Sequence, residues 1–444
     1  MDHAVVCGAG LAGLLSARVL ADRFARVTVV ERDRLTRGPR RGVPQGRHAH
    51  ALLPRGQQII DELFPGAVAE LVVAGAVPYR PLEQARMVLG GNRMCRAAMD
   101  NHGLALTRPF LEDHLRARLL ALPNVDLLDG WDAVAPTLTG DAVTALRIAR
   151  TDTAPGTRAA GGGGAEERVL PADLVVDAMG RAGRSSLWLG EAGFERPHTD
   201  RVAVDVGYAT CTFTLPDGVF GEDLLILVGS TPERPRGLAL FKVEGGRWIL
   251  STGGMCGDHP PTDLCGFLDY VASVIPGSMP DVMPALRAAP LPAEIVPARF
   301  PDAVRRRFER LRRVPRGLIA TGDAVCSVDP LYGQGMSAAA LQALALRDTL
   351  ADGGHDLERR FYRAAGRAAE TVWRFALTAD LAFPGVPGRL PLTSRMISRY
   401  VDRVQRAATK DPSCAIAFAR VLGLLDPPET LMRPAILRQT LRHG

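Results

Sequence analysis

The stretch HAVVCGAGLAGLLSARVLADRFARVTVVERD, residues 3–33, decides how the N-terminal part of the chain folds. It begins with a short apolar run, which is typical of a buried parallel strand. Three glycines follow in the spacing GxGxxG, at Gly8, Gly10 and Gly13, and the residues after them predict a helix. A second apolar run ends at Glu31, 18 residues beyond the third glycine. Strand, glycine turn, helix, strand and acid in this order predict the first βαβ unit of a Rossmann-like fold.

The three glycines have different physical roles in such a unit. The first permits the tight turn, the second lets the backbone approach a pyrophosphate, and the third lets the helix pack closely on the strand. The phosphates would lie at a helix N-terminus, where unpaired N–H groups and the helix dipole attract anions. Glu31, at the end of the second strand, would accept hydrogen bonds from ribose hydroxyls. We therefore expect a dinucleotide site here; a glycine turn with only a structural role is the alternative.

A second glycine-containing turn lies near the other end of the chain. The stretch GDAVCSVDPLYGQGMSAAALQALAL, residues 322–346, follows an apolar run at residues 316–321, and Asp323 comes directly after this predicted strand. The glycine spacing does not match a second Rossmann fingerprint. The pattern predicts an acid at a strand end and a helix N-terminus directed at an electron-rich group, and a core helix with an ordinary cap is the alternative. The turn and the start of the helix contain Pro330, Gly333, Gly335 and Met336.

Together the two loops resemble those of FAD monooxygenases of the para-hydroxybenzoate hydroxylase type. The resemblance implies that the first loop binds the adenine half of FAD and the second loop the flavin half. It also implies that Asp323 bonds the ribityl chain, and that the helix starting near Gly335 directs its N-terminus at the N1–C2=O edge of the flavin. The cofactor contacts implied in this way are Gly8, Gly10, Gly13, Glu31, Arg32, Arg40, Arg108, Asp323, Pro330, Gly333, Gly335 and Met336.

Further stretches extend the resemblance to about residue 350. RRGVPQGRHAH (residues 40–50) and LTRPFLEDHLRARL (residues 106–119) are similar to segments that carry cofactor-contacting arginines in that family. DLVVDAMGRAGRSS (residues 173–186) departs from the family pattern, because Asp177 is followed by Ala178 instead of glycine, which puts a nicotinamide contact there in doubt. The stretches GVPQGRHAH, GGMCGDHPPTD and DPLYGQGMS most resemble bacterial polyether-pathway and squalene-epoxidase-like flavin epoxidases.

The remaining sequence predicts two more structural parts. Alternating β-branched and aromatic stretches between Pro/Gly turns, from residue 202 onward, predict antiparallel strands, and the chain after residue 350 is mostly helical in pattern. We expect an α/β fold with a Rossmann-like FAD-binding domain around a parallel sheet, an antiparallel-sheet substrate domain and a C-terminal helical region. The expected boundaries are 1–75, 101–195 and 296–350 for the FAD-binding domain, 76–100 and 196–295 for the substrate domain, and 351–444 for the helical region.

Composition excludes several other classes of protein. The net charge of +6 rests on arginines that alternate with acids and form no stripe with aromatic residues, so nucleic-acid binding is not expected. Seven cysteines without a CxxC spacing predict neither a zinc site nor a disulfide framework, which favours a cytoplasmic location. No uninterrupted apolar run is long enough to predict a membrane span.

Few side chains suggest acid–base catalysis. His50 and Tyr332 are weak candidates, and no pattern of His, Cys or carboxylates predicts a metal site. A cofactor that carries the chemistry fits this inventory. The resemblance implies that NAD(P)H, directly or through a flavin reductase, reduces FAD, and that O2 then forms a flavin C4a-hydroperoxide. Transfer of oxygen to a small apolar organic substrate, by alkene epoxidation or aromatic hydroxylation, would modify a secondary metabolite.

Two alternatives remain open and a third is disfavoured. VVDAMGR (residues 175–181) also resembles a motif of FAD-dependent reductases that saturate isoprenoid double bonds. A non-catalytic FAD-binding protein is the other alternative. A flavin-dependent halogenase is disfavoured, because the chain has no lysine before Lys242 and no Trp-x-Trp motif.

Overall fold

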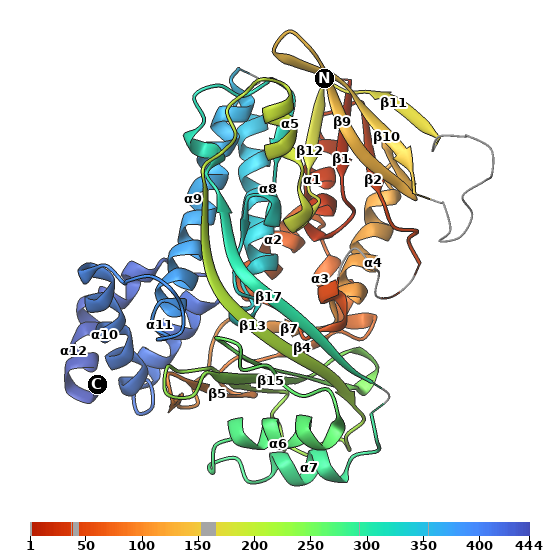
Figure 1. Cartoon of the computed structure of the whole chain (residues 1–444). Helices are drawn as coiled ribbons and strands as arrows, with labels where there is room; N and C mark the ends of the chain where they lie inside the picture. The colour runs from red at the N-terminus through yellow and green to blue at the C-terminus, as the bar shows by residue number, and fades with distance from the viewer. Residues whose placement is uncertain (1, 37, 39–43, 152–165, 293, 354) are drawn as a thin grey trace.

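A five-stranded parallel sheet forms around the N-terminal βαβ unit, as the computed structural model shows (Figure 1). β1 (His3–Cys7), α1 (Leu11–Ala21) and β2 (Arg26–Glu31) form where the apolar runs predict them. β1 is central and pairs in parallel with β2 and β12. The structure describes residues 2–36, 38, 44–151, 166–292, 294–353 and 355–444. The strand order is β18–β12–β1–β2–β8, with β8 at Val125–Asp129, β12 at Leu174–Asp177 and β18 at Leu318–Ala320.

Helices from distant parts of the chain pack against this sheet and against one another. α1 contacts α4 (Arg108–Leu120) and α8 (Gly335–Ala351), and α2 (Pro54–Leu63) also contacts α8. A Cβ atom on Gly56 would lie 2.5 Å from the Ser337 hydroxyl oxygen, so α2 and α8 can approach this closely only because residue 56 has no side chain. Two shorter helices of this part are α3 (Ala67–Val73) and α5 (Ser185–Glu191).

A second sheet of eight strands lies beyond the first. Its strands pair antiparallel, as predicted, except that β5 joins β14 in parallel. The exception arises because β5 comes from a segment far earlier in the chain than its partner. α6 (Leu264–Val274) and α7 (Val282–Ala288) cover one face with a separate apolar core. In sheet order the strands are β19 (Cys326–Ser327), β17 (Ile295–Arg306), β13 (Thr199–Phe213), β16 (Trp248–Gly254), β15 (Arg236–Lys242), β14 (Leu225–Val228), β5 (Ala85–Leu89) and β6 (Asn92–Arg93).

Two small antiparallel sheets complete the strands. One contacts β2 and β12 of the parallel sheet and has the order β11–β10–β9, and the other has the order β3–β7–β4. The strands of the first are β9 (Trp131–Thr139), β10 (Ala142–Arg150) and β11 (Glu167–Pro171). Those of the second are β3 (Ala51–Leu52), β4 (Val77–Tyr79) and β7 (Gly103–Ala105).

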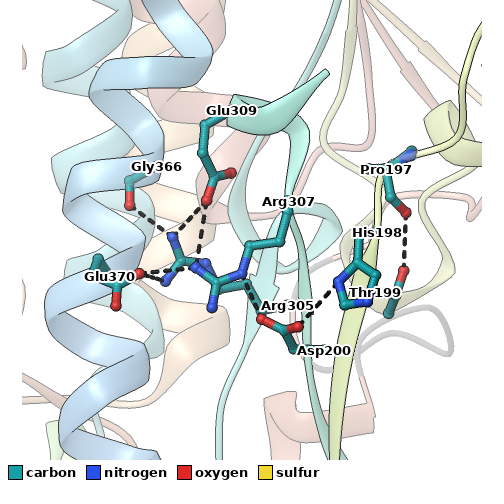
Figure 2. Close-up of polar contacts among 9 residues, drawn as sticks. All are labelled: Pro197, His198, Thr199, Asp200, Arg305, Arg307, Glu309, Gly366 and Glu370. Atoms are coloured by element: carbon teal, nitrogen blue, oxygen red, sulfur yellow. Dashed lines mark hydrogen bonds and ion pairs between the residues drawn. The ribbon is translucent and has the colours of Figure 1, made fainter. Parts of the chain in front are cut away.

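The long antiparallel pair β13 and β17 belongs to the eight-stranded sheet and extends from it toward the parallel sheet (Figure 1). α9 (Leu357–Asp380) lies beside this pair and also packs against α8. A network of ion pairs joins α9 to both strands (Figure 2). The Arg305 side chain is only 1% exposed and bonds Glu309, Glu370 and the Gly366 carbonyl. Arg307 bonds Asp200 and the same Glu370, so one acid of α9 holds two arginines of β17 and its extension.

The C-terminal helices form a compact group on one side of the molecule, next to β5 (Figure 1). α10 packs against α11 and α12, and their shared core also contains Leu82 and Met94 from the segment around β5 and β6. The tail therefore contacts both sheets, through α9 at one end and through α10–α12 at the other. Among the described residues, no helix is long and apolar enough to cross a membrane. The bounds are α10 (Leu392–Ala407), α11 (Pro412–Leu422) and α12 (Pro434–His443).

The Arg305 network predicts a specific loss of stability. Arg305→Ala removes hydrogen bonds between a buried guanidinium and charged groups, whereas Glu370 is 44% exposed and keeps Arg307, so the cost is about 1.5–3 kcal/mol. We expect Arg305→Ala to lower the free energy of unfolding by this amount, measured as a lower urea midpoint. Arg26→Ala is the matched control, because the Arg26–Asp126 pair is 61% and 54% exposed and is expected to contribute less than about 1 kcal/mol. Equal midpoints for the two variants would show that the network does not stabilise the fold.

Candidate functional site

One large cavity is bounded by both glycine loops, by the eight-stranded sheet and by the C-terminal helices. Its volume is about 1200 Å³, larger than the roughly 300–1,000 Å³ of most single-ligand sites, so it has room for a large cofactor and a second molecule. The candidate catalytic residues His50 and Tyr332 also line it. Of the residues predicted to contact a cofactor, the wall contains Gly10, Arg108, Asp323, Pro330, Gly333, Gly335 and Met336.

The two glycine loops touch each other at this cavity. A Cβ atom on Gly322 would lie 2.7 Å from the Cβ of Ala12, so the approach of the second loop to α1 requires glycine at residue 322. The Gly322 N–H donates to the Gln342 side chain of α8 at 2.8 Å, which fixes the turn to the following helix. Segments about 310 residues apart in the sequence thus form adjacent parts of one wall.

The first loop has the close contacts that its glycine spacing predicts. Gly8 has a φ of +103°, and a Cβ there would lie 2.7 Å from the Ala178 carbonyl oxygen. A Cβ on Gly13 would lie 1.8 Å from the Gly8 carbonyl oxygen. Side chains at either position are therefore incompatible with the turn. Gly10 precedes α1 and has no side chain that could cap it, and the first turn of α1 contains no acid. Glu112 of α4 accepts the Leu11 N–H but is itself paired with Arg108, so the positive end of the helix still favours an anion.

Glu31 lies against the first loop, at the end of β2. Its carboxylate is mostly buried and accepts hydrogen bonds from the Ala9 N–H at 2.8 Å and the Asp33 N–H at 3.1 Å. The Arg32 side chain is about half exposed, beside Asp33. Gly8, Gly13, Glu31 and Arg32 do not belong to the cavity wall that the described residues form. Arg40 lies outside the described residues.

Arg108 links the first loop to the second. Its guanidinium bonds Glu112 at 2.8 Å, and Glu112 in turn accepts a hydrogen bond from the Leu11 N–H at the start of α1. Burial raises the pKa of the Asp323 carboxyl, and the positive charge of Arg108 opposes this rise. No described residue donates a hydrogen bond to the Asp323 carboxylate, although it lines the cavity. It can therefore accept hydrogen bonds from a hydroxylated ligand.

The N-terminus of α8 opens onto the same cavity. Gly333 adopts a φ of +66° after the short turn Pro330–Tyr332, and Gly335 begins the helix. No side chain caps this end of α8, and its first turn contains no acid. A Cβ atom on Gly335 would meet nothing within 4 Å. The free N–H groups and positive dipole end of α8 thus border open space, which suits an electron-rich group.

The two histidines of the wall are weak bases. Burial lowers the pKa of His48 to about 4, and its ring bonds the Thr210 hydroxyl at 2.7 Å. Burial, together with the nearby charge of Arg108, lowers the pKa of His50 to about 4. The Nδ1–H of His50 donates to the His48 carbonyl at 2.9 Å, which leaves Nε2 as the acceptor. Both rings are therefore neutral at pH 7.

Beneath the second loop lies a pair of buried acids that the sequence did not point to. Asp329 is 0% and Asp380 is 1% exposed. The Tyr332 hydroxyl donates to Asp380 at 2.7 Å and thereby joins the turn to the end of α9. Burial raises the pKa of Asp380 to about 7, while burial and the charge of Asp380 raise that of Asp329. One oxygen of each carboxyl lacks a donor among the described residues, and the charge of Asp380 disfavours ionisation of Asp329.

A local sequence pattern identifies one of the two acids, Asp329, but not the other, Asp380. Asp329 directly precedes Pro330, a place where an aspartate commonly caps a turn, and it does accept the Leu331 N–H at 2.8 Å. Asp380 closes a helix of ordinary amphipathic pattern, and nothing local distinguishes it from a surface acid. Only the packing of α9 against the second loop brings the carboxyls together.

Apolar side chains from the eight-stranded sheet form the far wall of the cavity. They include Leu225, Leu227, Leu238 and Phe241. The sequence predicted this contribution, but the structure adds a third wall from the tail. α9, α10 and α11 contribute polar and apolar residues, among them Arg374, Phe375, Ile397, Val401 and Leu422.

Asp177 has a structural role in the described chain. Its carboxylate is fully buried and accepts hydrogen bonds from the Ser185 N–H at 2.7 Å, the Ser185 hydroxyl at 2.8 Å and the Met179 N–H at 3.2 Å. It therefore closes the turn before α5. Among the described residues, no group of three or more His, Cys, Asp or Glu is placed to hold a metal ion.

Comparison with known proteins finds a relative that is similar in sequence over the full length of the chain. The sequence is 34% identical to Protein Rv3254 of Mycobacterium tuberculosis (strain ATCC 25618 / H37Rv) over 456 aligned positions, which cover 100% of this chain and 94% of that protein. No protein-family model matches the chain.

Solved structures of flavin enzymes share the fold. PqsL, a probable FAD-dependent monooxygenase from Pseudomonas aeruginosa, has a TM-score of 0.63 at 17% identity and covers 85% of this chain and 95% of its own. The tetrameric form of 2-methyl-3-hydroxypyridine-5-carboxylic acid oxygenase gives 0.62 at 19%, with coverages of 96% and 97%. The flavin-dependent brominase Bmp2 gives 0.66 at 15%, with coverages of 99% and 100%.

The buried acid pair predicts a pH dependence of stability. The folded-state pKa of Asp380, about 7, lies above the ordinary value near 4. The stability contribution of this carboxyl is therefore fully present below about pH 4 and is lost as the pH rises through about 7. Asp380→Asn keeps an acceptor for Tyr332 and removes the ionisation. We expect the melting temperature of the variant, relative to wild type, to rise by several degrees between about pH 5 and about pH 8.5.

Asp269→Asn is the control for this measurement, because the side chain of Asp269 is 77% exposed. Its melting temperature relative to wild type should stay nearly constant over the same range. A pH-independent difference for Asp380→Asn would mean that Asp380 ionises as an ordinary surface acid does.

Proposed function

We propose that this chain, which belongs to the family of Protein Rv3254, is an FAD-dependent monooxygenase that transfers one oxygen atom from O2 to an apolar organic substrate. The observation that carries the proposal is the meeting of the two glycine loops at one cavity, with Gly322 against Ala12. One loop offers an anion site at a helix N-terminus, and the other offers an acceptor and a second helix N-terminus. A cofactor with a diphosphate at one end and an electron-rich ring at the other fits both.

The residues present fit FAD. The loop from Gly8 to Gly13 would hold the diphosphate, and Glu31 and Arg32 would lie at the adenosine end. Asp323 would accept the ribityl hydroxyls, because no described residue donates to its carboxylate. The open space at Gly335 would receive the flavin edge. Arg40 remains a contact predicted from the sequence. The domain boundaries stated above also remain proposals.

Bound FAD would supply the activation of O2, and the chain would supply binding, orientation and exclusion of water. The N–H groups at the start of α8 would stabilise negative charge on the reduced ring. The leucines and Phe241 of the far wall would hold an apolar substrate away from water. These tasks need no strong acid or base from the protein.

The weak bases of the cavity bear on the type of oxygenation. His48 and His50 are neutral at pH 7, since both have a pKa of about 4. The Tyr332 hydroxyl donates its hydrogen bond to Asp380. Epoxidation of an alkene needs no base, whereas hydroxylation of a phenol is helped by one. We therefore propose alkene epoxidation or hydroxylation of an already activated ring, on a substrate of secondary metabolism.

The hydrogen bonds of the Asp177 carboxylate bear on how FAD would be reduced. This carboxylate accepts hydrogen bonds from the N–H and the hydroxyl of Ser185, in the turn before α5. We therefore propose that NAD(P)H binds only transiently or that a separate flavin reductase delivers the electrons. Consumption of O2 together with product would distinguish the proposed reaction from reduction of an isoprenoid double bond, which consumes none.

The purified protein is expected to bind FAD without a covalent bond. Glu31→Ala should weaken FAD binding roughly tenfold or more, because a hydrogen bond to a charged group contributes about 1.5–3 kcal/mol. Isothermal titration of the apoprotein with FAD measures this loss. Glu191→Ala, an exposed acid on α5, is the control and should bind as wild type does. A colourless protein that takes up no FAD would refute the proposed function.

Two substitutions in the second loop should separate ring placement from cofactor retention. Gly335→Val places a side chain in the space proposed for the flavin, so the midpoint potential of bound FAD should fall as the α8 N–H groups move away from the reduced ring. Asp323→Ala should mainly weaken FAD binding, again roughly tenfold. Gly277→Val is the control, since its Cβ also meets nothing within 4 Å. An unchanged potential in Gly335→Val would mean that this loop does not contact the flavin.

A further inference from the structure

The net charge of the molecule is concentrated in its C-terminal tail. Residues 381–444 contain ten Arg and Lys against four Asp and Glu, a net of +6. The whole chain also has a net charge of +6, so residues 1–380 are neutral overall. Arginines alternate with acids in most of the chain, but here they outnumber them. An anionic partner would therefore be attracted to this part of the molecule.

α10 exposes apolar side chains and arginines along a single strip. Leu392, Met396, Arg399 and Arg403 follow one another at intervals of four, three and four residues, which places them on one face of the helix. Leu392 is 77% and Met396 is 70% exposed, and both arginines are exposed. In the described chain no acid forms an ion pair with either arginine.

The C-terminal end of α10 is the part of this helix that packs against its neighbours. Val404 and Ala407 are fully buried in the core shared with α11 and α12, and Ala407 lies on the same face as the strip, four residues after Arg403. The helix is thus held by its second half, while its first half projects Leu392 and Met396 outward. Two further apolar side chains of the tail, Met432 and Leu441, are also exposed.

The face of α10 opposite the exposed strip borders the large cavity. Ser394, Ile397, Ser398 and Val401 belong to the cavity wall. Ile397 is itself 49% exposed, so it lies both at the cavity and at the surface. These residues are separated from Leu392 and Met396 by about half a helical turn, so the exposed strip and the cavity lie on opposite sides of α10.

We propose that the outer strip of α10 docks on a membrane surface of anionic phospholipid. Leu392 and Met396 would enter the boundary between headgroups and acyl chains, and Arg399 and Arg403 would contact the phosphates. The docking rests on α10 and on the charge of the tail, and it does not depend on the proposed function.

The composition of the strip favours a bilayer over a protein partner. The tail around the strip has a net charge of +6, which an anionic bilayer attracts over its whole surface. An interfacial helix combines large apolar residues with arginines whose partners are the lipid phosphates. Two inserted side chains give weak, reversible binding.

Sedimentation with vesicles tests the docking on the full-length protein. We expect co-sedimentation with vesicles that contain phosphatidylglycerol, much less with pure phosphatidylcholine, and loss of binding at high salt. Arg399→Gln with Arg403→Gln should weaken binding roughly tenfold or more, since each arginine near an anionic surface contributes about fivefold. Leu392→Ser with Met396→Ser should also weaken it at least about tenfold.

Matched controls separate the strip from general charge and apolarity. Leu291→Ser removes a leucine that is 83% exposed elsewhere, and Arg310→Gln with Arg312→Gln removes two exposed arginines outside the tail. Both should bind vesicles as wild type does. Equal binding to both vesicle types, or equal loss in the controls, would overturn the proposal. So would sedimentation velocity that shows a dimer which Leu392→Ser with Met396→Ser dissociates, because the strip would then be a subunit interface.

The readout does not depend on FAD or on turnover. Vesicle binding by a protein that takes up no FAD would support the docking and refute the proposed function. A protein that binds FAD but does not co-sediment with anionic vesicles would refute only the docking.

Discussion

The contact between Gly322 and Ala12 is the constraint on which the arrangement of the site depends. It allows the turn after β18 to reach the start of α1, so that two helix N-termini open onto one cavity. Any side chain at residue 322 would separate them, since its Cβ would lie 2.7 Å from that of Ala12. The Gln342 side chain then fixes the turn by accepting the Gly322 N–H. Two anion-attracting helix ends held this close favour an extended ligand that is electron-rich at both ends.

The long strands β13 and β17 fix the position of the other half of the molecule relative to the two loops. They carry the chain from the parallel sheet to the eight-stranded sheet, and the buried Arg305 ties them to α9. The same helix ends at Asp380, which meets Tyr332 beneath the second loop. α9 is thus bonded near its middle to the strands and at its end to the turn before α8. The position of the tail, and with it the third wall of the cavity, follows from these two attachments.

The polar groups near the cavity serve mainly to hold its parts together. Glu31 bonds the first loop, Glu112 bonds Arg108 and the start of α1, and Asp177 closes the turn before α5. The histidines are neutral, and the acid pair under the second loop is inside the protein. The protein therefore offers a shaped, largely apolar space with helix dipoles at one side. Such a site suits chemistry carried by a cofactor.

The sequence by itself determined the βαβ unit at residues 3–31, the acid and helix at residues 323–351 and the antiparallel strands, because local apolar periodicity and glycine spacing specify them. It also contained the excess of arginine in the tail. Only the tertiary structure decided that the two loops touch, that Asp329 and Asp380 form a pair, and that α9–α11 complete the cavity. The pairing of β5 with β14 in parallel belongs to the same class. These features join residues far apart in the chain, and their energies come from packing and desolvation, which depend on neighbours that a local pattern does not reveal.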